Sequence, residues 1–253
     1  MGITNSDLLQ HLSELLQISK IKDYCPNGLQ VEGRKEIQKV VTGVTASQAL
    51  IDAAVEKGAD AIIVHHGYFW KGEDPCVKGM KKRRLAALLT NDINLYAFHL
   101  PLDVHPTLGN NAQLASLLDI TTTSGLESNN PFSVAMQGHF NQPLTHTALA
   151  DRLQRLLDNP VLSEGERQAE IKSVAWCTGG GQGYIDLAAE QGIDAFISGE
   201  VSEQTIHTAR EMNIHFFAAG HHATERYGAK ALGEYLANEF GLDVEFVDIP
   251  NPA

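Results

Sequence analysis

Two kinds of apolar pattern alternate along the chain. Short continuous runs such as Asp60-Ala-Ile-Ile-Val64 are typical of strands that are buried on both faces. Between them lie stretches in which apolar residues recur every three or four positions, as Leu50, Ala53 and Ala54 do before Gly58, and these stretches predict helices that end at a glycine. Regular alternation of strand and helix predicts an α/β protein with largely parallel sheets.

One strand–helix–strand segment occurs twice in the sequence. Residues 37–64 align without a gap to residues 171–198, and eleven of the 28 aligned positions are identical. The identical pairs include the aspartates Asp60 and Asp194 and the helix-ending glycines Gly58 and Gly192. This internal repeat predicts two related α/β lobes.

The repeat and its weaker continuation define the expected domains. We expect an N-terminal helix and turn over residues 1–36, a first α/β repeat over 37–125, an insertion over 126–170 and a second α/β repeat over 171–253. Asn5 and Ser6 are the expected cap of the first helix. The insertion is expected to hold a strand at 133–136, a helix at 147–157 and a polar turn at 163–166, and the second repeat is expected to end in a strand at 244–249.

Composition and charge narrow the classes of function. The chain has 19 Lys and Arg against 31 Asp and Glu, a net charge of −12, so binding to a polyanion such as DNA is not expected. No apolar run approaches the roughly 18–20 residues that a membrane span needs. Cys25, Cys76 and Cys177 form no CxxC pair, which argues against a disulfide framework or a cysteine zinc site and predicts a cytoplasmic protein.

Histidines and carboxylates gather where predicted strands end. Three strand ends are followed by such residues: His65 and His66, then His99 and Asp103, then His221, His222 and Glu225. Ligands of open α/β sheets bind at the carboxyl ends of the strands, and imidazoles with carboxylates are ligands of zinc, iron and manganese. The pattern therefore predicts a metal site.

The spacing of these residues suggests how they would bind metal ions. Glu225 lies four residues after His221 and three after His222, so one of these histidines shares a helix face with it. A glutamate can bridge two ions held roughly 3.5–4 Å apart, and Asp103 adds a second anionic ligand. For His99 and His222 the pattern leaves two roles open: they bind the metal themselves, or they support the ligands or face the substrate.

A glycine-rich loop is the second candidate feature. Gly179, Gly180 and Gly181 follow a predicted strand and precede a helix, where backbone N–H groups can bind an anion. A tight turn explains the same glycines, and the loop has neither the P-loop nor the Rossmann spacing. The basic run Lys81–Arg84 is typical of a solvated helix start, although it can also face a phosphate.

Several motifs together resemble the YbgI (NIF-three-like) family, whose members are called GTP cyclohydrolase 1 type 2 homologues. The motifs are Asn27–Gly33, Val41–Ser47, Val64–Trp70, His99–Asp103 and Ala219–Glu225. The resemblance covers almost the whole chain, is weakest over residues 124–170, and indicates a bacterial member of the family.

The resemblance implies a dinuclear metal centre between the two lobes and a homohexameric ring whose sites face an internal cavity. Carried over by residue, His66 and Asp103 bind one ion, His65 and His221 bind the other, and Glu225 bridges them. The expected cofactors are two divalent ions of iron, zinc or manganese.

The expected function is a metal-dependent hydrolase of a small substrate, such as a nucleotide or another phosphate-bearing molecule. The alternative is a non-catalytic metal-binding ring that recruits a partner. No catalytic residue is assigned, because no serine or cysteine has a nucleophile motif around it.

Overall fold

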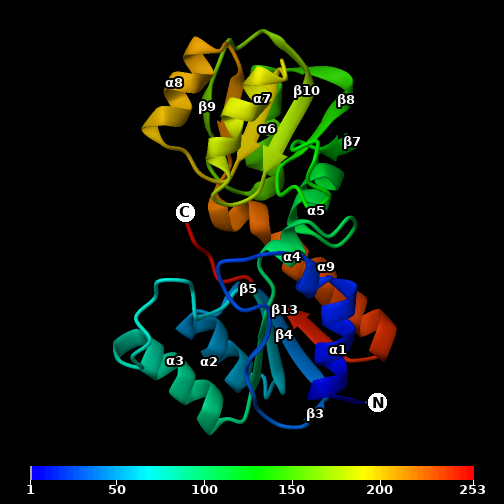
Figure 1. Cartoon of the computed structure of the whole chain (residues 1–253), viewed down its shortest axis with the longest axis vertical. Helices are drawn as coiled ribbons and strands as arrows, with labels where there is room; N and C mark the ends of the chain where they lie inside the picture. The colour runs from blue at the N-terminus through cyan, green and yellow to red at the C-terminus, as the bar shows by residue number, and fades with distance from the viewer. Residues whose placement is uncertain (1) are drawn as a thin grey trace. The chain divides into compact units, whose positions relative to one another are not determined.

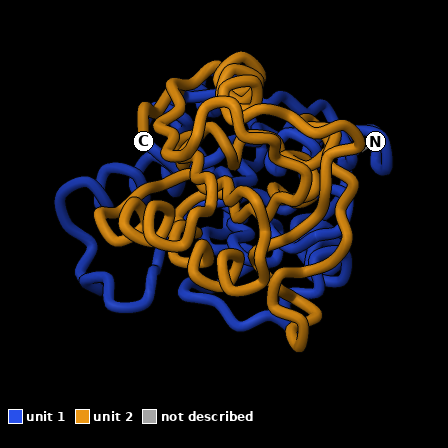
Figure 2. The backbone as a smooth tube through the Cα atoms, turned by 90° about the horizontal axis from the view of Figure 1, so that it is seen from above, with its two compact units in different colours: residues 1–108, 228–249 blue, residues 109–227, 250–253 orange. Residues whose placement is uncertain are grey.

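A computed structural model describes residues 2–253 of the chain, which form two compact units (Figure 2). Unit 1 comprises residues 1–108 and 228–249, and unit 2 comprises residues 109–227 and 250–253. These ranges differ from the expected domains in three ways. Residues 109–125, expected in the first repeat, belong to unit 2, helix α9 (His221–Phe240) is divided between the units, and the last strand belongs to unit 1. Each unit is a mixed α/β structure.

Unit 1 is built on a five-stranded sheet with the order β13-β4-β5-β6-β2. Its strands are β2 (Gly28–Val31), β4 (Lys39–Thr45), β5 (Ala61–His66), β6 (Asn94–Ala97) and β13 (Asp243–Phe246), and a separate pair is formed by β1 (Ile3–Thr4) and β3 (Glu36–Ile37). The sheet is parallel except at β2, which runs antiparallel to β6. Its helices are α1 (Asn5–Leu15), α2 (Gln48–Glu56), α3 (Gly79–Thr90), the short α4 (Leu100–Asp103), the second half of α9 and the 3₁₀ turn η1 (Ile18–Lys20).

Alternation along the strands gives this sheet two apolar faces. Val41 and Ile62 pack on α2 and α3, whereas their neighbours Val40 and Ile63 pack on α1 and α9. Figure 1 shows α2 and α3 on one side of the sheet and α1 and α9 on the other. A strand covered on both faces must be apolar at every position, which explains the continuous apolar run before His65.

Unit 2 is built on a six-stranded sheet with the order β7-β8-β10-β11-β12-β9. Its strands are β7 (Ile120–Gly125), β8 (Met136–Thr145), β9 (Leu162–Glu164), β10 (Glu170–Cys177), β11 (Ala195–Ser198) and β12 (His215–Ala218). Its helices are α5 (Asn110–Leu117), α6 (His146–Leu157), α7 (Ile185–Glu190), α8 (Glu203–Glu211), the first turns of α9 and the 3₁₀ turn η2 (Gln182–Tyr184). Helices α5 and α6 pack on one face of the sheet, and α7 and α8 pack on the other.

The repeated segments share their hydrogen bonds as well as their sequence. Val40 pairs with Ala61 in unit 1, and the equivalent Val174 pairs with Ala195 in unit 2. In each unit one aspartate carboxylate accepts hydrogen bonds from two successive backbone N–H groups: Asp60 from residues 38 and 39, and Asp194 from residues 172 and 173. These identical bonds explain why both aspartates are kept in the repeat.

Parallel pairing is less general than the sequence pattern predicts. Only β10, β11 and β12 are parallel in unit 2, while β7, β8 and β9 are antiparallel additions at its two edges. The expected insertion supplies β8, α6 and β9, so residues 136–164 complete the sheet of unit 2. The expected polar turn at 163–166 begins inside β9. Of the strand expected at 133–136, only Met136 is in a strand, as the first residue of the long β8.

Two local predictions are also corrected. The first helix is capped by Thr4, whose hydroxyl accepts from the backbone N–H of Asp7, and not by Asn5 or Ser6. The strand expected at 244–249 is shorter and pairs with β4 of unit 1, not with the second repeat. Over residues 2–253, no helix is long and apolar enough to cross a membrane.

Candidate metal centre

Two neighbouring strands of unit 1 deliver the first group of candidate ligands. Strand β5 ends in His65 and His66, and β6 is followed by His99 and by α4, which ends at Asp103. Pro101 lies in the first turn of α4, where its missing N–H costs nothing, and the N–H of Asp103 bonds to the carbonyl of His99. The short helix therefore returns Asp103 toward the end of β5.

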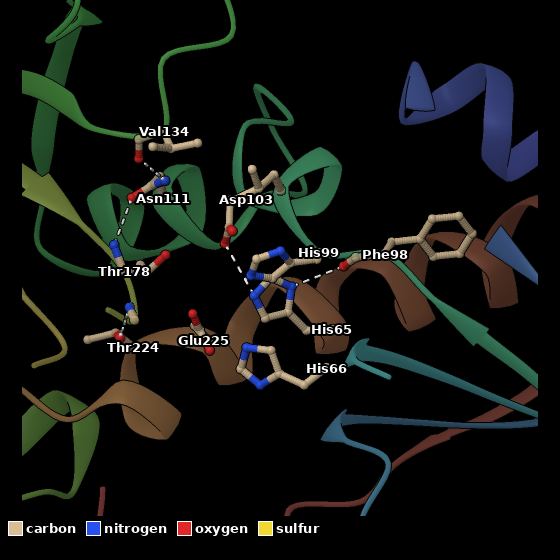
Figure 3. A network of polar contacts seen from close by, with 12 residues as sticks. His65, His66, Phe98, His99, Asp103, Asn111, Val134, Thr178, Thr224 and Glu225 are labelled. Atoms are coloured by element: carbon tan, nitrogen blue, oxygen red, sulfur yellow. Dashed lines mark hydrogen bonds and ion pairs between the residues drawn. The ribbon is translucent and has the colours of Figure 1, made fainter. Parts of the chain in front are cut away.

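The three histidines form one cluster. The ring of His65 lies 4.4 Å from that of His66 and 5.0 Å from that of His99, measured between centroids. Each offers a ring nitrogen within 4.8 Å of the others, close enough to hold a metal ion (Figure 3). His65 is fully buried, so the packing of its neighbours fixes the position of its imidazole.

Outer hydrogen bonds fix how each ring is turned. His65 donates from Nδ1 to the carbonyl of Phe98 at 3.0 Å, Nδ1 of His66 lies 3.1 Å from the Thr45 hydroxyl, and Nδ1 of His99 donates to Asp23 at 2.7 Å. A carbonyl can only accept, so Nδ1 of His65 carries the proton and Nε2 carries a lone pair. Histidines that bind metals are held in this way, with the second nitrogen bonded to a backbone carbonyl or a carboxylate.

Asp103 faces the lone pair of His65. Its Oδ1 lies 3.6 Å from Nε2 of His65, and the aspartate is buried. This separation is long for a hydrogen bond but suits two ligands that share one ion, each at about 2.0–2.2 Å from it.

Asp23, which the sequence did not single out, orients His99. Its carboxylate also accepts from Asn27 and from the backbone N–H of Leu100. Burial by itself raises the pKa of Asp23, but the hydrogen bonds from His99 and Asn27 and the charge of His99 outweigh it, so the pKa is lowered. Asp23 is thus an anion that holds the His99 ring, and nothing in its sequence context distinguishes it from an ordinary turn residue.

Cys25 is the remaining potential ligand in this part of unit 1. It shares a candidate group with Asp23 and His99. Burial and the charge of Asp23 raise the pKa of its thiol to about 12. The thiolate is the form that binds metals, so with no ion bound the Cys25 thiol is held in its protonated form.

Unit 2 carries a second group at the start of α9. Nε2 of His221 lies 3.2 Å from Oε2 of Glu225, and Nδ1 of His221 donates to Glu200 at 2.8 Å. The structure thereby distinguishes between the adjacent histidines, since His221 shares the helix face with Glu225. The backbone N–H of His222 bonds to the carbonyl of Ala253.

The environment of His221 favours positive charge. Burial lowers the pKa of this imidazole, but the hydrogen bonds and charges of Glu225 and Glu200 outweigh burial and raise the pKa to about 9. Glu225 is itself buried. A place that stabilises a cation between two carboxylates is chemically suited to a metal ion.

Glu200 is the second functional residue that the sequence analysis missed. It occupies the position of the second repeat that is equivalent to His66, just beyond the end of β11. A search of the repeat for ligand-type residues, rather than identical residues, would have found it.

The glycine-rich loop packs directly against these carboxylates. Gly179 has a φ of +64°, and a Cβ there would collide with Oε1 of Glu225, while a Cβ at Gly181 would collide with the thiol of Cys177. The N–H of Gly179 donates to the Thr224 hydroxyl at 3.0 Å. Close packing explains Gly179 and Gly181, and Glu200 near Gly180 gives the loop a negative neighbour. Anion binding by Gly179, Gly180 and Gly181 stays a prediction.

The comparisons with known proteins agree with the motif resemblance. A family model described as Duf34/NIF3 (NGG1p interacting factor 3) matches residues 3–252. A Yersinia pestis protein named "GTP cyclohydrolase 1 type 2 homolog" is 63% identical over 98% of this chain and 99% of its own length. An Escherichia coli protein with the same name is 58% identical over 98% of this chain and 99% of its own length.

Solved structures show the same fold. The protein ybgI, described as of unknown function, is 56% identical with a TM-score of 0.95 and covers 99% of this chain and 100% of that one. TTHA1606 from Thermus thermophilus is 32% identical with a TM-score of 0.86, over 99% of this chain and 100% of that one. Matches of this extent leave no part of the fold unaccounted for, and the chain belongs to the Duf34/NIF3 family.

Proposed function

We propose that the chain binds two divalent metal ions with ligands from both units. His65, His66 and Asp103 of unit 1 and His221 and Glu225 of unit 2 would be the ligands. The observation that carries this proposal is the direction of the ring nitrogens: Nε2 of His65 faces Asp103, and Nε2 of His221 faces Glu225. In both histidines Nδ1 bonds a partner on the other side.

Each group by itself offers too few donors for two ions. Tetrahedral sites use four ligands per ion, and catalytic sites use three from the protein and keep one position open. Of the five proposed ligands, unit 1 supplies two histidines and one carboxylate, and unit 2 supplies one histidine and one carboxylate. Together, with Glu225 binding both ions, they give each ion three protein ligands.

The distance between His65 and Asp103 supports one pairing of the proposed ligands. These two would share one ion, while His66 and His221 would hold the other. This pairing exchanges His65 and His66 relative to the one that the family resemblance implies. The donors are all nitrogen and oxygen, which suits zinc, iron or manganese.

We further propose that the centre hydrolyses a small substrate, such as a nucleotide or another phosphate-bearing molecule. The relatives' name states homology to a GTP cyclohydrolase and supports this class. When bound, the two ions would supply Lewis-acid activation of water and substrate. His99 lies beside the ligands with Nδ1 held by Asp23, so its ring is placed to accept a proton from the reacting water and to return it to the leaving group.

Assembly into a hexameric ring in the cytoplasm is part of the same proposal, because the family resemblance implies it. Light scattering at micromolar concentration should then give a mass near 165 kDa, six times the 27.5 kDa of one chain. A 27.5 kDa monomer at every concentration would contradict the ring.

Metal analysis of three variants tests the ligand set. Protein purified without chelators should contain about two ions per chain. Glu225→Gln should bind markedly less than one, because an amide is a poor bridging ligand, whereas Asp103→Asn and His221→Ala should each keep close to one. His222→Ala is the matched control, since it removes the neighbouring histidine and should keep two. Two ions in Glu225→Gln would show that Glu225 is not the bridge.

Turnover assays test the reaction. Metal-loaded protein should hydrolyse at least one member of a panel of nucleotides and phosphoesters, and Glu225→Gln should lose that activity. Full metal loading with no turnover across the panel would favour the non-catalytic alternative.

A further inference from the structure

Two aromatic side chains approach His99 from separate loops of unit 1. The indole of Trp70 meets the imidazole of His99 edge to face, with centroids 4.9 Å apart and planes at 84°. The ring of Tyr24 lies 6.2 Å from His99, and Trp70 also lies 6.0 Å from His66. Aromatic rings therefore lie beside two of the candidate metal-site histidines.

The loops that carry these rings are tied together. The N–H of Lys71 donates to the carbonyl of Tyr24 at 2.7 Å. Gln30 links the same regions, because its amide accepts from the N–H of Tyr68 and donates to the carbonyls of Tyr68 and Pro26. One backbone bond and the side-chain amide of Gln30 thus tie the segments that carry Tyr24 and Trp70 to each other.

The residue before Trp70 has a strained backbone conformation. Phe69 has a φ of +65°, a left-handed conformation that is costly for an aromatic residue. Lys81 lies over the Phe69 ring at 4.9 Å and pairs with Glu73, which also accepts from the N–H of Trp70. The indole N–H of Trp70 donates to the carbonyl of Gly67. A strained residue that several contacts hold in place is characteristic of a binding site.

Exposure separates this arrangement from core packing. Tyr24 is 62% exposed although its ring stands beside the half-buried His99. A packing role would bury the ring, whereas a ligand-stacking role leaves it exposed until the ligand arrives.

We propose that Tyr24 and Trp70 form a stacking subsite for a planar nitrogen heterocycle, such as a nucleobase, whose polar edge faces His99. The proposal deepens the proposed function, on whose metal centre it rests, by naming the part of the substrate that the protein recognises. Both aromatic faces would stack on the heterocycle, and the imidazoles would meet its polar atoms.

Tryptophan fluorescence gives a direct readout. The chain has two tryptophans and Trp176 is fully buried, so quenching by an added ligand reports on Trp70. Guanosine and adenosine monophosphates should quench the signal of the purified protein, whereas ribose 5-phosphate, which lacks the ring, should not. Equal effects of all three would overturn the proposal.

Variants separate stacking from packing, with binding measured by calorimetry. Tyr24→Ala should weaken nucleotide binding about ten- to hundredfold, and Tyr24→Phe should restore it. Leu89→Ala is the matched control, because Leu89 is equally exposed in the same unit and should leave binding unchanged. Unchanged binding in Tyr24→Ala, or a change in its oligomeric mass with no change in binding, would overturn the subsite.

Metal content measured on the same samples keeps the two proposals distinct. Two bound ions per chain, with no quenching of fluorescence by nucleotides, would support the metal centre and reject the subsite. Nucleotide quenching that Tyr24→Ala weakens, in protein that binds no metal, would keep the subsite and reject the metal centre.

Discussion

Each unit of this protein contains a cluster of histidines, and the two clusters differ in where their nitrogens point. In unit 1 the rings of His65 and His99 are 5.0 Å apart, and in unit 2 the rings of His146 and His215 are 5.1 Å apart. The Nδ1 atoms of His146 and His215 bond each other at 3.0 Å, and Nε2 of His146 bonds the Ser163 hydroxyl. In unit 1 each Nδ1 bonds a residue outside the cluster instead.

The charged neighbours differ as well. Asp103 faces His65 directly in unit 1. In unit 2 burial lowers the pKa of His146, with His215 and Arg167 adding to the effect and Glu164 opposing it. Burial also lowers the pKa of His215 against the opposing charges of Asp194 and Glu166. Ring proximity is therefore a weak criterion for a metal site, and the direction of the lone pairs together with a facing carboxylate is a stronger one.

Replacing one histidine in each cluster should give the largest difference in metal content between two variants. His65→Ala should lose about one of the two expected ions, because a first ligand is removed, while His215→Ala should keep both. Elemental analysis of both variants checks this, with circular dichroism to confirm folding. Metal loss in His215→Ala and not in His65→Ala would reverse the assignment of the two clusters.

Glycine substitutions should separate stability from metal binding. Gly165 has a φ of +147° and a Cβ there would collide with His215, so Gly165→Ala should destabilise unit 2 by about 1–3 kcal/mol and leave metal content unchanged. Gly179→Ala should displace the Glu225 carboxylate and lower metal content.

Chemical denaturation and metal analysis of the two glycine variants measure these effects. Gly58→Ala is a control for backbone strain alone, because its φ is +67° and no atom lies within 4 Å of the added Cβ. Full metal content in Gly179→Ala would contradict the close approach of Glu225.

Acid should weaken unit 2 through its histidine pair. The folded state lowers the pKa of both His146 and His215, so unfolding takes up protons as the pH falls. The contribution of the pair to stability is complete above the ordinary histidine pKa of about 6.5 and is lost as the pH falls from there through the lowered values. Chemical denaturation between pH 7.5 and 5 measures this in the wild type and in His215→Asn. The free energy of unfolding should depend less on pH in the variant. Equal pH dependence in the two proteins would exclude the histidine pair as the cause.

The smallest effect on stability and metal content is expected from a substitution of Asp23. Asp23→Asn removes the charge that holds His99, should cost about 1 kcal/mol of stability, and should leave the metal content unchanged. If the proposed hydrolase reaction is found, its rate should fall while metal affinity stays the same. A loss of ions in this variant would make His99 a ligand rather than a neighbour of the ligands.

Local rules predicted much of this molecule from its sequence. The alternation of apolar runs and amphipathic stretches identified the repeated strands and helices of both units, and Gly58 and Gly192 end their helices with the positive φ that a residue after a helix favours. The same pattern placed His65, His66, His99 and Asp103 at the ends of adjacent strands, because parallel strands end at one edge.

Tertiary structure decided what depends on partners far apart in the sequence. Strand β13 pairs with β4 rather than with the second repeat, and β8 and β9 complete a sheet that local pattern could not assign to them. Asp23 and Glu200 could be recognised as part of the candidate site only from their hydrogen bonds to His99 and His221. Short-range propensity fixes the type of an element, but strand pairing and the choice of a hydrogen-bond partner are settled by which surfaces pack together.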